Sequence, residues 1–129
     1  MARNGRRSRR LVVGTEELWW FLGHRHRESE GPPVDCCELL TVRRRADHGG
    51  RLVVAFPAGP GRLVPDGFLP GGTVGLLGGE PVNLHRPGVV RALVDAALAR
   101  GWDPGSRAVL ELDGWGLLPT TGRPDGPTR

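Results

Sequence analysis

The stretch CCELLTVRRRADHGGRLVVAF, residues 36–56, decides the fold. It holds two runs with strand-like composition, Cys36–Arg45 and Arg51–Phe56, in which apolar and β-branched side chains predominate. Between them lies ADHGG, residues 46–50, a segment rich in residues that favour turns. The stretch therefore predicts two antiparallel strands joined by a hairpin turn.

On the N-terminal side of this hairpin, the dense apolar run Leu18–Leu22 (LWWFL) predicts a strand buried on both faces or nearly so. The pattern then becomes polar in GHRHR, residues 23–27, where we expect the chain to leave the core. On the C-terminal side, residues 57–81 contain five prolines and many glycines, which argues against a central strand. Short strands and a large ordered loop both remain open for that segment.

The clearest helix lies at Pro87–Arg100, with a proline suited to its first turn and Gly101 suited to the position after its end. Its apolar residues fall on one half of the helix, and Arg91 and Asp95 lie opposite. A last strand is expected at Ala108–Leu112. The order predicts an α+β fold with a mostly antiparallel sheet of about five strands and one amphipathic helix packed on one face. We expect four tryptophans to anchor the core: Trp19, Trp20, Trp102 and Trp115.

Length and charge predict one domain with basic residues concentrated at its start. The chain has 129 residues, and we divide it into a disordered basic leader (1–10), a single domain (11–119) and a flexible tail (120–129). The leader carries five arginines and no acid, while the rest has 13 arginines against 14 acids, a net charge of −1. A solubilising leader and one that touches phosphates are both compatible with this pattern.

The cellular setting follows from segments that the sequence lacks. No apolar run approaches the roughly 18 residues of a membrane helix, and the run after the leader is too short for a signal peptide. The only cysteines, Cys36 and Cys37, are adjacent, and we expect them to be reduced thiols. We therefore expect a cytoplasmic protein without membrane contact.

Two patterns suggest chemistry at histidine and cysteine. His24 and His26 have the i,i+2 spacing that places both on one side of a strand, and with Cys36 they form a candidate zinc site. The alternative is a polar strand end beside semi-buried cysteines. A Cys–His nucleophile pair is a second possibility, but no family signature surrounds the thiols. We expect no cofactor, and the sequence leans away from an enzyme.

Three surfaces are candidates for binding. His85 and Arg86 precede the helix, where an anion could dock on free backbone N–H groups, although local capping is the commoner explanation for such residues. The alanines Ala92, Ala96 and Ala99 leave one side of the helix free for a partner. An arginine cluster is expected at one end of the sheet, without aromatic residues for stacking on unpaired bases. Its members are Arg25, Arg27, Arg43, Arg44, Arg45 and Arg51.

The segment Asn83–Arg100, followed by Gly101-Trp102-Asp103-Pro104, resembles the C-terminal part of small uncharacterised α+β proteins common in GC-rich actinobacteria. In those proteins a similar helix is followed by a Gly-Trp-x-Pro turn and a last strand. The resemblance implies the same ending here and a bacterial cytosolic setting. It implies no activity and no site residue.

These observations favour a small non-catalytic module that binds another protein or itself, as an accessory subunit, an adaptor or an immunity-type partner. The alternative is a nucleic-acid-associated protein that uses the basic leader and the arginine cluster. A His/Cys metal protein or thiol enzyme is the third hypothesis.

Overall fold

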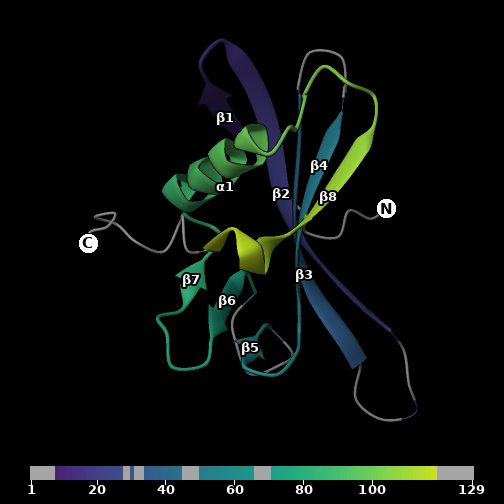
Figure 1. The fold of residues 1–129 in the computed structure, drawn as a ribbon, viewed down its shortest axis with the longest axis vertical. Coiled ribbons are helices and arrows are strands. Elements are labelled where there is room, and N and C mark those ends of the chain that lie inside the picture. The colour runs from purple at the N-terminus through teal and green to yellow at the C-terminus, as the bar shows by residue number, and fades with distance from the viewer. Residues whose placement is uncertain (1–7, 28–29, 31–33, 45–49, 66–70, 119–129) are drawn as a thin grey trace.

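The computed structural model describes residues 8–27, 30, 34–44, 50–65 and 71–118, and it has an α+β fold (Figure 1). The main sheet has the strand order β1-β2-β3-β4-β8. The first four strands form an antiparallel meander, and β8 lies parallel to β4. Their bounds are β1 Arg9–Val13, β2 Glu16–Arg27, β3 Val34–Arg44, β4 Arg51–Pro57 and β8 Val109–Asp113. The expected fold class and the antiparallel pair around the hairpin are therefore confirmed, while the turn itself falls largely on residues 45–49, outside the described part.

Between β4 and the helix, the proline-rich segment forms short strands. A second sheet has the order β5-β6-β7, with β5 at Arg62–Leu63, β6 at Thr73–Leu76 and β7 at Val82–Asn83. Val74 of β6 joins the hydrophobic core of the main sheet, as do Val64 and Leu84, which directly follow β5 and β7. The small sheet is therefore packed against the main sheet.

The helix α1 spans Pro87–Ala99 and ends one residue before the expected boundary, with Arg100 as its C-cap. Gly101 follows with φ of 103°, a left-handed conformation that glycine adopts without a steric penalty. The helix buries four of its own side chains in the core: Val90, Leu93, Val94 and Ala97. A turn and β8 follow, in the order that the resemblance implies.

Strand alternation gives the main sheet two different faces. The inner face is covered by α1 and the small sheet, and its core residues include Leu18, Trp20, Leu40, Val42, Leu52, Val54 and Phe56. By register, the outer face carries Arg10, Trp19, Phe21, Arg25, Cys37, Leu39, Thr41, Arg43, Arg51, Val53, Ala55, Val109 and Glu111. Figure 1 shows α1 on one side of the sheet only.

Trp20, Trp102 and Trp115 are buried in the core as expected. The Trp115 ring meets Phe56 edge to face at 5.3 Å, and its Nε1 donates to the Pro57 carbonyl over 2.8 Å. Trp19 does not belong to the core, because it lies on the outer face and is half-buried. The run 18–22 is therefore not buried on both faces, since the described helix and small sheet cover only one of them.

One boundary at the start of the chain was wrong. β1 begins at Arg9, so Arg9 and Arg10 belong to the sheet and not to a leader that ends at residue 10. The apolar side chains of Leu11 and Val13 pack against the core and hold this strand in place. β2 continues to Arg27, and His24, Arg25 and His26 are exposed, as expected of the part of the chain that leaves the core. Residues 1–7 and the expected tail, 120–129, lie outside the described residues.

Candidate functional site

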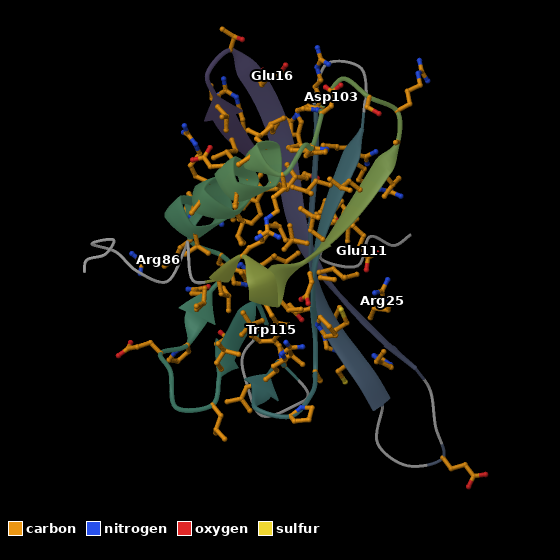
Figure 2. All side chains as sticks on the ribbon, viewed as in Figure 1. Glu16, Arg25, Arg86, Asp103, Glu111 and Trp115 are labelled. Atoms are coloured by element: carbon orange, nitrogen blue, oxygen red, sulfur yellow. The ribbon has the colours of Figure 1, made fainter. Side chains whose placement is uncertain are left out.

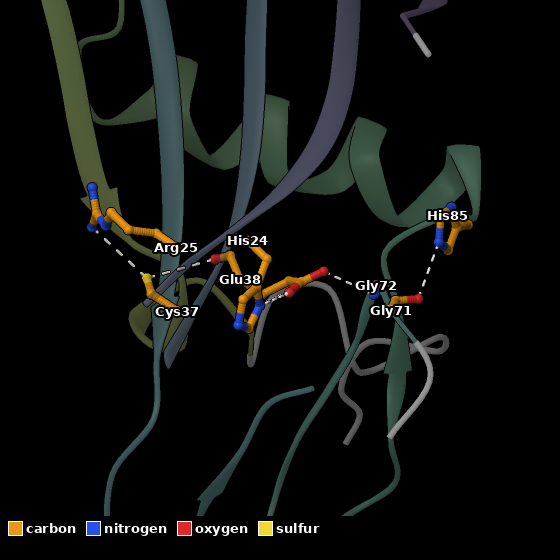
Figure 3. Close-up of polar contacts among 7 residues, drawn as sticks. All are labelled: His24, Arg25, Cys37, Glu38, Gly71, Gly72 and His85. Carbon is orange, nitrogen blue, oxygen red and sulfur yellow. Dashed lines mark hydrogen bonds and ion pairs between the residues drawn. The ribbon is translucent and has the colours of Figure 1, made fainter. Parts of the chain in front are cut away.

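Among the residues that the structure describes, the most buried charged side chain lies on the inner face of β3, next to the segment that leads into the small sheet. Glu38 is only 4% exposed, and a 2.9 Å hydrogen bond joins its Oε1 to Nδ1 of His24 on the neighbouring strand β2. The backbone N–H of Gly72 donates to Oε2 over 2.9 Å (Figure 3). Both carboxylate oxygens are thereby hydrogen-bonded, which offsets the cost of burying the group.

A second histidine extends this contact toward the helix. Nε2 of His85 donates to the carbonyl of Gly71 over 3.1 Å, directly beside the Gly72 amide that binds Glu38 (Figure 3). Gly72 has φ of 84°, and a Cβ there would lie 2.5 Å from Nε2 of His85, so only glycine fits. The chain of contacts links β2 and β3 to the small sheet and to the segment before α1.

The candidate metal ligands are not gathered into one site. The rings of His24 and His26 are 5.7 Å apart, but Nδ1 of His24 pairs with Glu38. Cys36 is 6% exposed and packs into the core. Among the described residues, no three His, Cys, Asp or Glu side chains are arranged to hold a metal ion.

The thiol of Cys37 lies on the outer face, one residue from Cys36 and on the opposite side of the sheet. Burial raises the pKa of the Cys37 thiol, and the guanidinium of Arg25, with Nη2 3.9 Å from Sγ, only partly opposes this shift. A raised pKa keeps the thiol protonated at neutral pH, the opposite of what an activated nucleophile needs. Both cysteines are free thiols.

The expected arginine cluster is divided between two ends of the sheet. In the register of β2 and β3, Arg25 lies opposite Cys37 at the end of β2. Arg43 lies opposite Trp19 near the start of β2. Six residues of β3 separate the two positions, about 20 Å at the rise of a strand. The prediction was wrong because consecutive antiparallel strands bring the end of one beside the start of the next. Arg27 lies at the Arg25 end, in β2.

The arginines at the other end differ in their surroundings. Arg44 faces inward and forms an ion pair with Glu16 over 3.2 Å. Arg43 and Arg51 lie directly opposite each other on the outer face. Arg45 is outside the described residues. Figure 2 shows Arg25 and its ion-pair partner Glu111, 3.6 Å away, on the side of the sheet away from α1.

The candidate binding residues before the helix and on its surface are only partly accessible to a ligand or partner. The N–H of His85 donates to Oδ1 of Asn83 over 2.9 Å, and its ring binds Gly71, so both of these groups are engaged locally. Arg86 is the N-cap residue, is exposed and makes no side-chain cap hydrogen bond. Of the alanines, Ala92 and Ala96 are half-buried and Ala99 is exposed. The helix surface is therefore less open than the sequence suggests.

Sequence reasoning missed three features. Glu38 was not singled out, because nothing in the pattern of β3 distinguishes a buried carboxylate from one at a strand edge. The glycine- and proline-rich segment was expected to offer uncovered surface, but the sequence did not show that Leu63 and Leu77 are the exposed apolar residues in it. The pairing of Trp19 with Arg43 was missed because the patterns of the two strands do not fix the register between them.

No family model matches the chain, and no curated protein or solved structure is significantly similar to it. The resemblance of its C-terminal part to small actinobacterial proteins stays a prediction. In the described part of the chain, no helix is long and apolar enough to cross a membrane. Function must therefore be inferred from the geometry of the chain itself.

Proposed function

We propose that the protein is a small non-catalytic binding module and that a partner protein docks on the exposed leucines of its small sheet. The observation that carries this proposal is the exposure of Leu63 and Leu77, which are 45% and 75% accessible to solvent. Single exposed apolar residues are ordinary, but neighbouring ones on a common surface are typical of interaction sites.

The register explains why these two leucines form one surface. Leu63 pairs with Gly75, and the N–H of Leu77 donates to the Gly61 carbonyl over 2.7 Å, which extends the pairing of β5 and β6 by one residue. Leu63 and Leu77 are thus diagonal neighbours on one side of the ribbon. The position opposite Leu63 is Gly75, which is buried beside the backbone of Glu80 and Pro81, so the exposed apolar surface is that of the two leucine side chains themselves.

The surroundings support a binding role over a catalytic one. Glu38, bound to His24, also accepts a hydrogen bond from the Gly72 amide and so joins the main sheet to the small sheet, and burial raises the pKa of the Cys37 thiol, which disfavours the reactive thiolate. Two adjacent free thiols suit a reducing compartment, and we extend the proposal to a cytoplasmic location.

The experiment compares the tagged full chain with Leu77→Glu and with Ala99→Glu, a matched charge on the exposed helix surface. Light scattering after size exclusion detects a second copy, and quantitative capture from native lysate detects a different protein. We expect Leu77→Glu to reduce the association about tenfold or more, because an unpaired charge would be buried in the interface. Ala99→Glu should bind like the wild type.

Two results would overturn the proposal. Undiminished association of Leu77→Glu rules out the leucine surface, and loss with Ala99→Glu alone moves the interface to the helix. A strict monomer that captures no protein contradicts protein binding itself.

A further inference from the structure

The two outermost strands of the main sheet, β1 and β8, each have a free edge. None of the strands that the structure describes pairs with the second side of either one, and they lie on opposite sides of the sheet (Figure 1). Backbone N–H and C=O groups on such an edge can pair with a strand of another molecule. Each edge strand also carries an exposed valine on the outer face: Val12 of β1 is 47% exposed and Val109 of β8 is 55% exposed.

The pairing of β1 with β2 shows which backbone groups of β1 face its free edge. A two-residue turn joins the strands, so Val13 and Glu16 on either side of it form a hydrogen-bonded pair. Hydrogen-bonded and non-hydrogen-bonded pairs alternate along an antiparallel ladder. The N–H and C=O groups of Arg10 and Val12 therefore point away from β2 and toward the free edge.

The corresponding groups of β8 follow from its parallel pairing with β4. The carbonyl of Ala108 accepts a hydrogen bond from the N–H of Arg51 over 3.2 Å, so Ala108 faces β4. Successive residues of a strand direct their backbone groups to alternate sides. Val109 and Glu111 therefore direct theirs toward the free edge.

The two edges match each other in one register. When β1 of a second copy lies antiparallel to β8, Val12 can lie opposite Val109. In the same register Arg10 lies opposite Glu111, and the leucine between the two residues of each strand meets its counterpart on the inner face. A shift by one residue would lose the hydrogen bonds, and a shift by two would place a charged side chain opposite a valine.

The charges on the two edges are opposite in sign, which favours pairing of unlike edges over pairing of like ones. Arg10 and Glu111 already form ion pairs within the chain, with Glu17 and Arg25, but these pairs are exposed and contribute little stability. Both charged groups therefore remain accessible to a partner strand. Pairing of β1 with β1 would bring arginines together, and pairing of β8 with β8 would bring acidic residues together, which destabilises a strand pair.

We propose that copies of this chain associate head to tail, with β1 of one copy added to β8 of the next as an antiparallel strand. The main sheet then continues from one copy into the other. Because the two contacting surfaces differ, each added copy leaves one free edge at either end, and association continues beyond a dimer until a ring closes. The contact uses neither Leu63 nor Leu77, so it is additional to the leucine surface.

Sedimentation velocity of the purified full chain, from about 10 μM to about 1 mM, tests this proposal over the range of weak interfaces. We expect an average mass that rises with concentration beyond that of a dimer. Arg10→Glu and Glu111→Arg each give two edges of the same sign, and each should weaken association at least about fivefold. Arg86→Glu and Glu80→Arg make the same changes in charge at exposed residues outside both edges and should associate like the wild type.

Mixing the two edge variants tests the pairing directly. Arg10→Glu has two acidic edges and Glu111→Arg has two basic ones, so an equimolar mixture should recover most of the association that each lacks alone. Val12→Pro removes an N–H that points to the free edge and keeps the pairing with β2, and it should also weaken association. Circular dichroism checks that each variant is folded. Leu77→Glu should associate through the edges like the wild type.

Four outcomes would overturn the inference. The first is a monomer whose mass does not change up to the highest concentration. The second is association that stops at a dimer, which indicates a symmetric contact. The third is a mixture of folded edge variants that stays unassociated. The fourth is loss of self-association in Leu77→Glu with none in the edge variants, which would assign the contact to the leucine surface and support the proposed function instead.

Discussion

The two faces of the main sheet are built from the same strands but differ in composition and surroundings. On the inner face, Trp20, Leu40 and Val54 are 0–2% exposed beneath α1 and the small sheet. On the outer face, the side chains buried at the centre are small, and larger ones such as Trp19 and Arg43 are only half-buried. The inner face therefore buries most of the apolar side chains of the sheet, whereas the outer face carries charged groups and half-buried rings.

The largest predicted change in the free energy of unfolding comes from replacing two adjacent tryptophans, one on each face of the sheet. Trp20→Ala should lower the free energy of unfolding by about 3–5 kcal/mol, because it empties a fully packed site. Trp19→Ala should cost about 1–2 kcal/mol, as expected for a side chain that is only half-buried. Urea unfolding of both variants gives the two values. Equal losses would show that the outer face is covered in the folded protein.

The difference between the two faces shows which features of the fold can be predicted from the sequence and which cannot. The hairpin around residues 36–56, the helix and the last strand follow from local patterns of apolar residues and turns. The assignment of Trp19 and Trp20 to opposite faces also follows from alternation, but which face is covered depends on where α1 packs, a long-range property. The start of β1 was missed because Arg9 and Arg10 look like a solvated leader until their pairing with Trp20 and Trp19 is known.

A smaller change in the free energy of unfolding is expected from neutralising a buried carboxylate, and a smaller one still from neutralising an exposed one. Glu38→Gln on the inner face should lower the free energy of unfolding by about 1.5–3 kcal/mol, since the amide cannot accept both hydrogen bonds from His24 and Gly72. Glu111→Gln on the outer face breaks only an exposed ion pair with Arg25 and should cost less than about 1 kcal/mol.

Urea unfolding measures both changes, and hydrogen exchange at the Gly72 amide reports the local contact. Faster exchange is expected in Glu38→Gln and not in Glu111→Gln. If the two variants lost the same stability, the buried carboxylate would not be holding the sheets together.

The candidate sites were less predictable than the fold because they depend on register. Arg43 and Arg51 lie opposite each other beside the hairpin turn, but Arg25 and Arg27 lie at the other end of the sheet. The aromatic residues judged to be missing near the arginines are present, because Trp19 lies opposite Arg43. The buried position of Glu38 could not be predicted, because its hydrogen-bond donor Gly72 is 34 residues away in sequence.

The smallest effect concerns the two cysteines, which differ in the face they occupy. The chain has no lysine and no tyrosine, so the thiols are the only side chains that titrate between about pH 8.5 and 11. Because burial raises the pKa of Cys37 in the folded protein, the unfolded state releases its proton first as the pH rises. The free energy of unfolding should therefore be at its full value below the ordinary pKa of a thiol and fall as the pH rises through the raised value. Cys37→Ala should flatten this decline in the free energy of unfolding, whereas Cys36→Ala should keep the decline caused by Cys37. If the free energy of unfolding fell as steeply with pH in Cys37→Ala as in the wild type, the Cys37 thiol would not be its cause.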